Sequence, residues 1–322
     1  MNDIKKFWKK LKYKIKHLCK TVDYVNDRSA KFKILILLEI LWCRIVYRTT
    51  INEYRIFEYY LISHNKRKTY LNTRKHRSYL FYLSDKKIIN ILKDKELFGL
   101  RFKDYYKREV IDVNKLTFKE YENLCLENKR LICRSNSSSY LSSFKIYDLA
   151  DYRSPAYMID SIKKDKKVLV EKCFKTHKQL SEISEDPVII NVTTLCTSDK
   201  VEIVSSSIKI KSSEIISGFI DTKTGTIKGH LKDHDGHNAG NISGKEIPKY
   251  KEIIKLSKVL AKELEEIKEV EWSFTVNYRG TIYLLDANPY EDFIFEQTPE
   301  FLNNRIGLLP TYKKVIKKIR GF

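Results

Sequence analysis

The sequence predicts an α+β fold, in which a helical N-terminal part is followed by antiparallel strands. Of the 10 glycines, only Gly99 precedes Gly218, so residues 1–110 are nearly free of the residue that most readily interrupts a helix. After about residue 115, β-branched runs of strand length replace the helical periodicity. The strands follow one another through short turns rather than alternating with helices, which is not typical of a parallel doubly wound sheet.

The first twenty residues, MNDIKKFWKKLKYKIKHLCK, predict a basic amphipathic helix. Apolar residues recur at helical spacing while lysines occupy the other face. Such a helix can lie on an anionic membrane surface, which would make residues 1–20 a peripheral membrane contact. The alternative is an ordinary packed helix with solvated lysines, and the sequence leaves both open.

The most apolar stretch, ILILLEILWCRIVY (Ile34 to Tyr47), predicts a buried helix. It contains Glu39 and Arg44 and is too short and too charged to span a bilayer. Two further segments, 51–71 and 86–98, also carry helical apolar patterns. Residues 1–110 are therefore expected to form a helical module.

The strand pattern beyond residue 115 ends in a helix and a hairpin. A short strand at Leu131 to Cys133 runs into a serine-rich loop, and a buried-type strand covers 167–174. Two hairpins are predicted, one joining 188–197 to 201–211 and the next turning at 222–225. A helix over 247–267 precedes a hairpin that turns at 277–280. The predicted divisions are residues 1–110, 111–172 and 173–322.

The last predicted hairpin carries a candidate metal site. Asp286 and Asn288, two residues apart on a strand, point to one face. If Val276 pairs with Thr281, Asp286 faces Glu271, and Ser273 and Glu271 share the face of Asp286 and Asn288. Carboxylate and amide oxygens suit Mg²⁺, and two opposed carboxylates repel if they are not neutralised. The alternative is a solvent-facing hairpin with incidental acids.

Charge and cysteine content bound the partners. A net charge of +21 favours a solvated basic surface or an anionic polymer or membrane partner. No zinc-finger spacing, RNP motif or basic leucine-zipper region indicates sequence-specific nucleic-acid binding. The six cysteines form no CxxC pair, and the N-terminus has no signal-peptide pattern. We therefore expect reduced thiols and a cytoplasmic protein.

Six segments in order resemble the ATP-grasp superfamily, in its branch associated with sugar transfer and with capsule and surface-polysaccharide genes. They are YRTTINEYRIFEYYLI with KRKTYL, RLICRS, VLVEKCFKTHKQLSEI, GFIDTKTGTI, IPKYKEIIKLSKVLAKEL and the VEWSFTV to GTIYLLDAN hairpin. The resemblance implies an ATP-grasp fold after the helical module, with two lobes that clamp ATP. It also implies a ligase that forms an amide-type bond through an acyl phosphate.

The same resemblance assigns roles to residues of this sequence. Asp286 and Asn288 match the Mg²⁺ ligands. The hinge that contacts the nucleotide falls on Glu171, Lys172, Cys173 and Phe174, with His177 just beyond it. Lys209 matches a basic residue that contacts phosphate or a substrate carboxylate. For Glu171, His177 and Lys209, ordinary structural or surface roles are the alternative.

The sequence also departs from the family pattern. The phosphate-contacting lysine is Arg134, which keeps the charge but not the geometry. The lid SNSSSYLSSF has no glycine, leaving the hydroxyls and amides of residues such as Ser137 and Ser138. Asn191 stands at a family arginine, and together with Arg134 and Lys209 it is expected to be catalytic. Ser273 stands at the first metal acid, where Glu271 is a possible substitute.

Three hypotheses follow. The first is a divergent ligase that uses ATP and Mg²⁺ on carboxylate and amine substrates, expected to be sugar-linked, in cell-surface polysaccharide synthesis. The second is a catalytically degenerate relative that binds a nucleotide or acts as a scaffold partner. The third is a basic protein that binds an anionic membrane or nucleic acid, with no specific nucleic-acid sequence.

Overall fold

In the computed structural model, the described residues are 2–136, 143–197, 199–211, 214–233, 237–289, 293–299, 301–302 and 304–321. Contacts divide the chain into two compact units. The first joins Met1–Tyr82 to Asp292–Phe322, and the second is Leu83–Glu291. The C-terminal segment therefore packs with the N-terminal helices, and residues 83–110 of the expected helical module pack with the strands.

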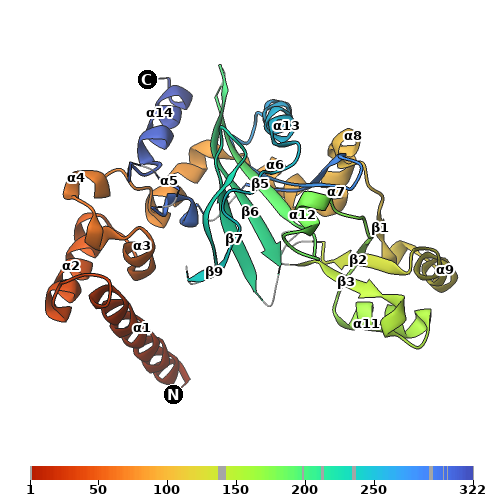
Figure 1. Ribbon diagram of the computed structural model, residues 1–322, viewed down its shortest axis with the longest axis horizontal. Helices are drawn as coiled ribbons and strands as arrows, with labels where there is room; N and C mark the ends of the chain where they lie inside the picture. The colour runs from red at the N-terminus through yellow and green to blue at the C-terminus, as the bar shows by residue number, and fades with distance from the viewer. Residues whose placement is uncertain are drawn as a thin grey trace. The chain divides into compact units, whose positions relative to one another are not determined.

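The first unit is helical (Figure 1). Thr50 begins one of its short helices with a capping box, in which Thr50 and Glu53 satisfy each other's backbone N–H groups. Glu53 also accepts hydrogen bonds from the backbone and hydroxyl of Thr73, at 2.6 and 2.7 Å. Its elements are α1 (Asn2–Asn26), α2 (Lys33–Val46), α3 (Ile51–Ile56), η1 (Tyr59–Leu61), α4 (His64–Arg67), α5 (Thr73–Leu83), η4 (Phe295–Gln297) and α14 (Leu309–Ile319).

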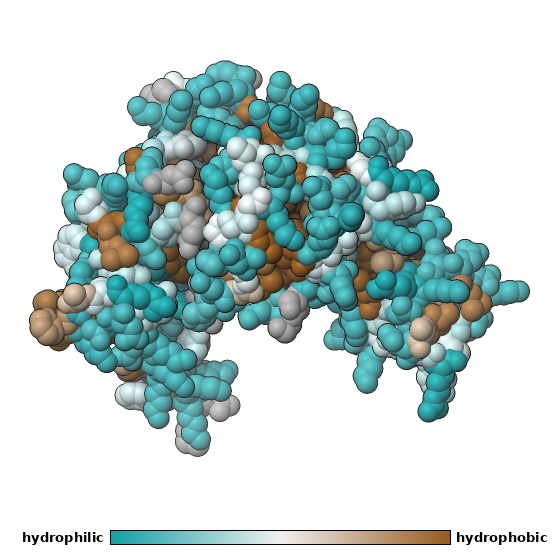
Figure 2. Space-filling view, viewed as in Figure 1, coloured by the Kyte–Doolittle hydropathy of each residue, from teal (hydrophilic) through white to brown (hydrophobic). Residues whose placement is uncertain are grey.

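The prediction that Ile34 to Tyr47 is a buried helix is half wrong. Helix α2 forms, and it buries Ile36, Ile40 and Cys43 against the unit's core. Its other face carries large apolar side chains in solvent. They are Ile34, Leu35, Leu38, Leu41, Trp42, Ile45 and Val46, with Phe32 just before the helix. Figure 2 shows apolar side chains gathered on the surface over α2, at the lower left.

The second unit contains two antiparallel sheets, which confirms the predicted α+β class. A four-stranded sheet has the order β1-β4-β2-β3, and a seven-stranded sheet the order β11-β10-β5-β6-β7-β8-β9. The strands are β1 (Val110–Asp112), β2 (Arg130–Arg134), β3 (Lys145–Asp148), β4 (Leu169–Lys172), β5 (Ile189–Cys196), β6 (Val201–Lys211), β7 (Ile215–Ile220), β8 (Ile227–Lys232), β9 (Asn238–Asn241), β10 (Glu269–Val276) and β11 (Ile282–Asn288).

Helices cover these sheets and close two cores. One core lies between the seven-stranded sheet and α13, around Trp272, Phe274 and Leu260, and the other lies under α9 and α11. Ile132 of β2 packs with Ile189 and Leu285, so the two sheets share a small apolar cluster. The helical elements of this unit are α6 (Lys86–Lys93), α7 (Lys95–Arg101), α8 (Lys103–Tyr106), η2 (Val113–Lys115), α9 (Phe118–Asn128), η3 (Leu149–Asp151), α11 (Pro155–Lys164), α12 (Lys178–Ser181) and α13 (Tyr250–Glu263).

The predicted register of the hairpin between β10 and β11 is wrong in two ways. It is shifted by one residue at the turn, and it does not include a bulge in β11. Val276 pairs with Ile282 rather than Thr281. Between Phe274 and Ser273 the register shifts, because Leu285 is an extra residue in β11. Leu285 points into the apolar cluster that the two sheets share, which explains why β11 accommodates it.

Two smaller sequence expectations can be compared with the structure. All six cysteines are free thiols. Within the described residues, no helix combines the length and apolar character that crossing a membrane requires.

Candidate functional site

The bulge in β11 restores the predicted grouping of side chains on the last hairpin. Ser273 lies opposite Asp286, and Glu271 lies opposite Asn288. The four residues therefore still share one face of β10 and β11, although each β10 residue lies opposite a β11 residue two positions later than predicted. Both carboxylates are buried: Asp286 is 0% exposed and Glu271 is 2% exposed. This face is polar within an otherwise apolar hairpin.

Asp286 is neutralised by a lysine from a distant part of the chain. Lys95, the first residue of α7, places its Nζ 2.6 Å from Asp286 Oδ1 and also donates to the carbonyl of Leu92. The backbone N–H of Ala287 donates to the same carboxylate oxygen at 2.8 Å. Lys95 is also almost fully buried. A buried carboxylate without such a partner would not remain charged at low cost.

Arg134 and Glu171, both predicted nucleotide contacts, are joined to each other. Arg134 Nε lies 2.8 Å from Glu171 Oε1, and Arg134 is 0% exposed. Arg108 pairs with the same carboxylate, and Arg134 also bonds to the hydroxyl of Tyr106. Burial and then Glu171 raise the pKa of Tyr106 to about 12, so this hydroxyl stays protonated. The group forms a buried ion-pair network that joins β2, β4 and residues 106–108.

The other buried carboxylate, Glu271, is held by two predicted catalytic residues. Asn191 Nδ2 donates to Glu271 Oε1 at 2.8 Å. Lys209 Nζ lies 3.2 Å from Glu271 Oε2 and remains partly exposed. In the described part of the chain, the carbonyl oxygen of the Asn191 side chain is buried with no hydrogen-bond partner. Lys209 is thus the cation of this cluster that solvent or a ligand reaches most readily.

The remaining predicted contacts lie along the segment after β4. Lys172 is exposed, and Cys173 is half-buried, which raises the pKa of its thiol. Phe174 packs edge-on against Tyr283 of β11, with ring centroids 5.5 Å apart. His177 caps α12 by accepting the N–H of Gln179. Ser137 and Ser138 lie outside the described residues.

The oxygen donors of the hairpin suit Mg²⁺ in kind, but lysines already bind the acids. Glu271, Asp286, Asn288 and Ser273 provide the hard oxygen ligands that Mg²⁺ takes. Among the described residues, no group of three His, Cys, Asp or Glu side chains is placed to hold a metal. Asp286 and Glu271 carry Lys95 and Lys209 instead. A cation entering here would have to displace an ammonium group from a carboxylate.

The sequence patterns did not predict three residues of this site: Lys95, Tyr106 and Arg108. Arg108 pairs with Glu171 and donates to the carbonyl of Leu284 at 3.2 Å. All three come from the segment before β1, which was assigned to the helical module. In the sequence, the segment that contains these three residues shows only short helical patterns interrupted by polar and aromatic residues. Nothing in that pattern points to partners as distant as Leu284 and Asp286.

Comparisons with known proteins give structural likenesses alone. No protein-family model matches the chain, and no curated protein matches its sequence. Similar solved structures include D-alanyl-alanine synthetase A from Vibrio cholerae, at 13% identity, TM-score 0.46, and coverage of 71% of this chain and 66% of that one. D-alanine–D-alanine ligase from Bacillus anthracis is similar at 16% identity and TM-score 0.45, with 72% and 68% covered.

A third similar structure is N5-carboxyaminoimidazole synthase from Aspergillus clavatus, in complex with ADP and a ribonucleotide. It has 9% identity and a TM-score of 0.45, and 69% of this chain matches 52% of that one. The chain therefore spans about two thirds of the length of the first of these three proteins and about half of the length of the third.

Proposed function

We propose that the second unit is an ATP-grasp nucleotide site of a ligase that joins a carboxylate to an amine. The observation that carries the proposal is the grouping of Glu271 and Asp286 with Lys95 and Lys209. The resemblance of the sequence supports it, since its segments fall on β2, β4, the β7–β8 hairpin, α13 and the β10–β11 hairpin. Polysaccharide synthesis, with sugar-linked substrates, is the part of the proposal that rests on the sequence resemblance alone.

The chain's own residues would act by exchanging ion-pair partners. Lys209 is the partly exposed cation, and its distance of 3.2 Å from Glu271 Oε2 is longer than a strong charge-assisted bond. A phosphate group competes effectively for such an ammonium, because it offers several charged oxygens. Arg134 would then act by fixing Glu171 rather than by touching the nucleotide, since its guanidinium is buried.

Magnesium would be held by Asp286, Asn288 and Glu271, where it would neutralise phosphate charge. The ammonium groups now on the two carboxylates would then be available for anionic oxygens. Ser273 contributes a neutral hydroxyl where the family pattern has an acid, which lowers the negative charge of the site.

The test is isothermal titration of Mg·ATP into the full-length protein, combined with assays of ADP release in the presence of carboxylate and amine substrates. We expect binding, and we expect the Asp286→Asn variant to lose turnover. Absence of binding at millimolar Mg·ATP would exclude the ligase.

A second candidate is a non-catalytic relative that keeps the fold. The burial of Arg134, which pairs with Glu171 and bonds to Tyr106, favours it, because a guanidinium that is 0% exposed has no access to phosphate. Binding of Mg·ATP without ADP release, whichever carboxylate and amine are added, is the expected result for this candidate. Turnover that depends on Asp286 would exclude it.

The first unit supports a further candidate activity, peripheral contact with an anionic membrane. The exposed face of α2 carries large apolar side chains, with Ile45 78% exposed. Helix α1 exposes Phe7, Trp8 and Ile15 among its lysines. Exposed apolar side chains next to basic ones match an anionic lipid surface.

Vesicle flotation tests this contact. The Leu38→Ser/Ile45→Ser variant removes two exposed side chains and none of the core, so it should fold normally. We expect it to lose most of its binding to phosphatidylserine vesicles, because buried apolar area drives insertion. The Val259→Ser variant, at an exposed apolar position of α13, is the control and should bind as the wild type does. Equal binding by all three proteins would exclude α2 as the contact.

A further inference from the structure

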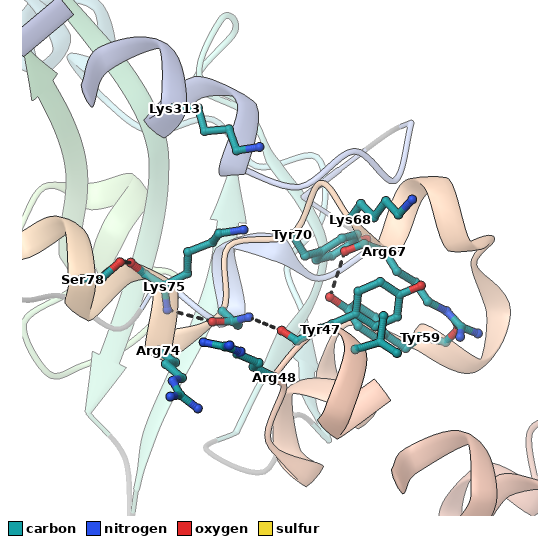
Figure 3. A pocket seen from close by; sticks show the side chains of 12 residues that line it. Tyr47, Arg48, Tyr59, Arg67, Lys68, Tyr70, Arg74, Lys75, Ser78 and Lys313 are labelled. Atoms are coloured by element: carbon teal, nitrogen blue, oxygen red, sulfur yellow. Dashed lines mark hydrogen bonds between the residues drawn. The ribbon is translucent and has the colours of Figure 1, made fainter. Parts of the chain in front are cut away.

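The first unit contains a cavity of about 600 Å³ that is lined by cations and lies outside the proposed nucleotide site (Figure 3). Its basic lining residues are Arg48, Arg67, Lys68, Arg74, Lys75 and Lys313. Among the residues that the structure describes, no carboxylate lines it. The volume lies within the range of pockets that hold small molecules.

Hydrogen bonds connect the chain segments that form the walls of this cavity. Asn72 donates to the carbonyl of Tyr47 at 2.6 Å and accepts from the backbone of Lys75 at 2.8 Å. Leu309, at the start of α14, donates to the carbonyl of Thr69 at 2.9 Å. These bonds connect the three segments that carry Arg48, Lys75 and Lys313.

One of the six cations is structural, and the other five line the cavity: Lys75 is partly buried, whereas Arg48, Lys68, Arg74 and Lys313 are exposed to solvent. Arg67 is buried, pairs with Glu39, and donates to the carbonyls of Tyr59 and Ile62. For Arg48, Lys68, Arg74, Lys75 and Lys313, the described residues provide no ion-pair partner. Burial lowers the pKa of Lys75, and the charges of Lys313 and Arg48 lower it further, so these groups are close enough to repel.

We propose that this cavity binds a small phosphate-bearing polyanion, of the diphosphate type. Like charges that line one cavity attract an anion, most strongly at the partly buried Lys75, because water screens the exposed cations around it. Arginine forks and lysine ammonium groups together are the usual ligands of phosphate oxygens. Tyr47, Tyr59 and Tyr70 form an aromatic side of the lining, which suits a ligand with an apolar or ring portion next to its phosphates.

Hydrogen exchange of the full-length protein, with and without inorganic pyrophosphate, tests the proposal. We expect protection in segments 46–48 and 67–78, which separates this cavity from any binding in residues 83–291. The Lys75→Gln/Lys313→Gln variant should weaken binding by at least about tenfold. The Lys314→Gln/Lys317→Gln variant removes the same charge from α14 outside the cavity and should bind as the wild type does. Succinate, a carboxylate dianion, should give no protection.

Two sources of phosphate are distinguished by a vesicle arm. If phosphatidylcholine vesicles containing phosphatidic acid protect these segments through Lys75 and Lys313, and pyrophosphate does not, the ligand is a lipid headgroup. Protection by pyrophosphate identifies a soluble ligand. The proposal is overturned if neither probe protects the segments, if Lys75→Gln/Lys313→Gln leaves protection unchanged, or if succinate protects equally.

Discussion

At the scale of single residues, the buried pair of Lys95 and Asp286 is expected to be sensitive to substitution, because both side chains are almost fully buried. We expect Lys95→Met to lower the free energy of unfolding by about 3–5 kcal/mol, because it leaves an uncompensated buried carboxylate. Urea unfolding followed by circular dichroism measures this. The Lys95→Met/Asp286→Leu variant should recover much of the loss. If Lys95→Met alone were as stable as the wild type, the pair would not be the buried contact described here.

A second residue, Asp221 in the β7–β8 turn, links stability to pH. Its hydrogen bond with Lys228, together with the N–H groups of Lys223 and Thr224, lowers its pKa from 3.8 to about 2. A lowered pKa stabilises the fold above pH 3.8, and this contribution disappears as the pH falls to about 2. Asp221→Asn should therefore cost on the order of 1 kcal/mol at neutral pH, and progressively less below pH 3.8.

Urea unfolding at several pH values between 2 and 7 measures the effect of Asp221→Asn. The gap between wild type and variant should be constant above about pH 4 and should narrow below it. If the difference in the free energy of unfolding between the two proteins did not change with pH, the role of Asp221 would be contradicted. The variant cannot carry the negative charge, so the difference should disappear once the wild-type carboxylate is protonated.

At the scale of elements, the β7–β8 turn also depends on a glycine. Gly225 has φ of +79°, and a Cβ there would lie 2.6 Å from Tyr250 Cδ1. Gly225→Ala should destabilise the protein by more than about 1 kcal/mol, since strain and a clash act together. Gly244→Ala is the matched control, with φ of +88° and nothing within 4 Å of the added Cβ. Thermal unfolding compares them, and equal losses would exclude the contact with Tyr250.

The elements themselves were largely predictable, because they depend on local patterns. The β5–β6 hairpin, the turn at 277–280 and helix α13 fall where alternation, turn residues and helical spacing placed them. The register of β10 with β11 was not, because a bulge at Leu285 is set by packing against Ile132 and Ile189 from other strands. The exposure of α2 was missed for a similar reason, since apolar content alone does not say which face is covered.

At the scale of the whole molecule, the grouping of charged residues could be predicted only in part. Strand periodicity places Glu271 with Ser273 and Asp286 with Asn288, but the two pairs share one face only because the bulge at Leu285 offsets the one-residue error in the predicted register. The neutralisation of Asp286 by Lys95 and of Glu171 by Arg108 depends on contacts between distant segments, which no local pattern encodes. The same limit applies to the net charge of +21, since composition does not reveal that six basic residues line one cavity of the first unit.

The central claim is that the second unit binds Mg·ATP through the charged groups beneath the β10–β11 hairpin. Isothermal titration of Mg·ATP into the wild type, Lys209→Gln and Lys251→Gln proteins tests it most directly. Lys251 is an exposed lysine of α13, so its variant is the control for loss of one charge. We predict binding by the wild type and Lys251→Gln, and binding about tenfold weaker or worse by Lys209→Gln. Absence of binding by the wild type, or equal affinity in all three proteins, would contradict the claim.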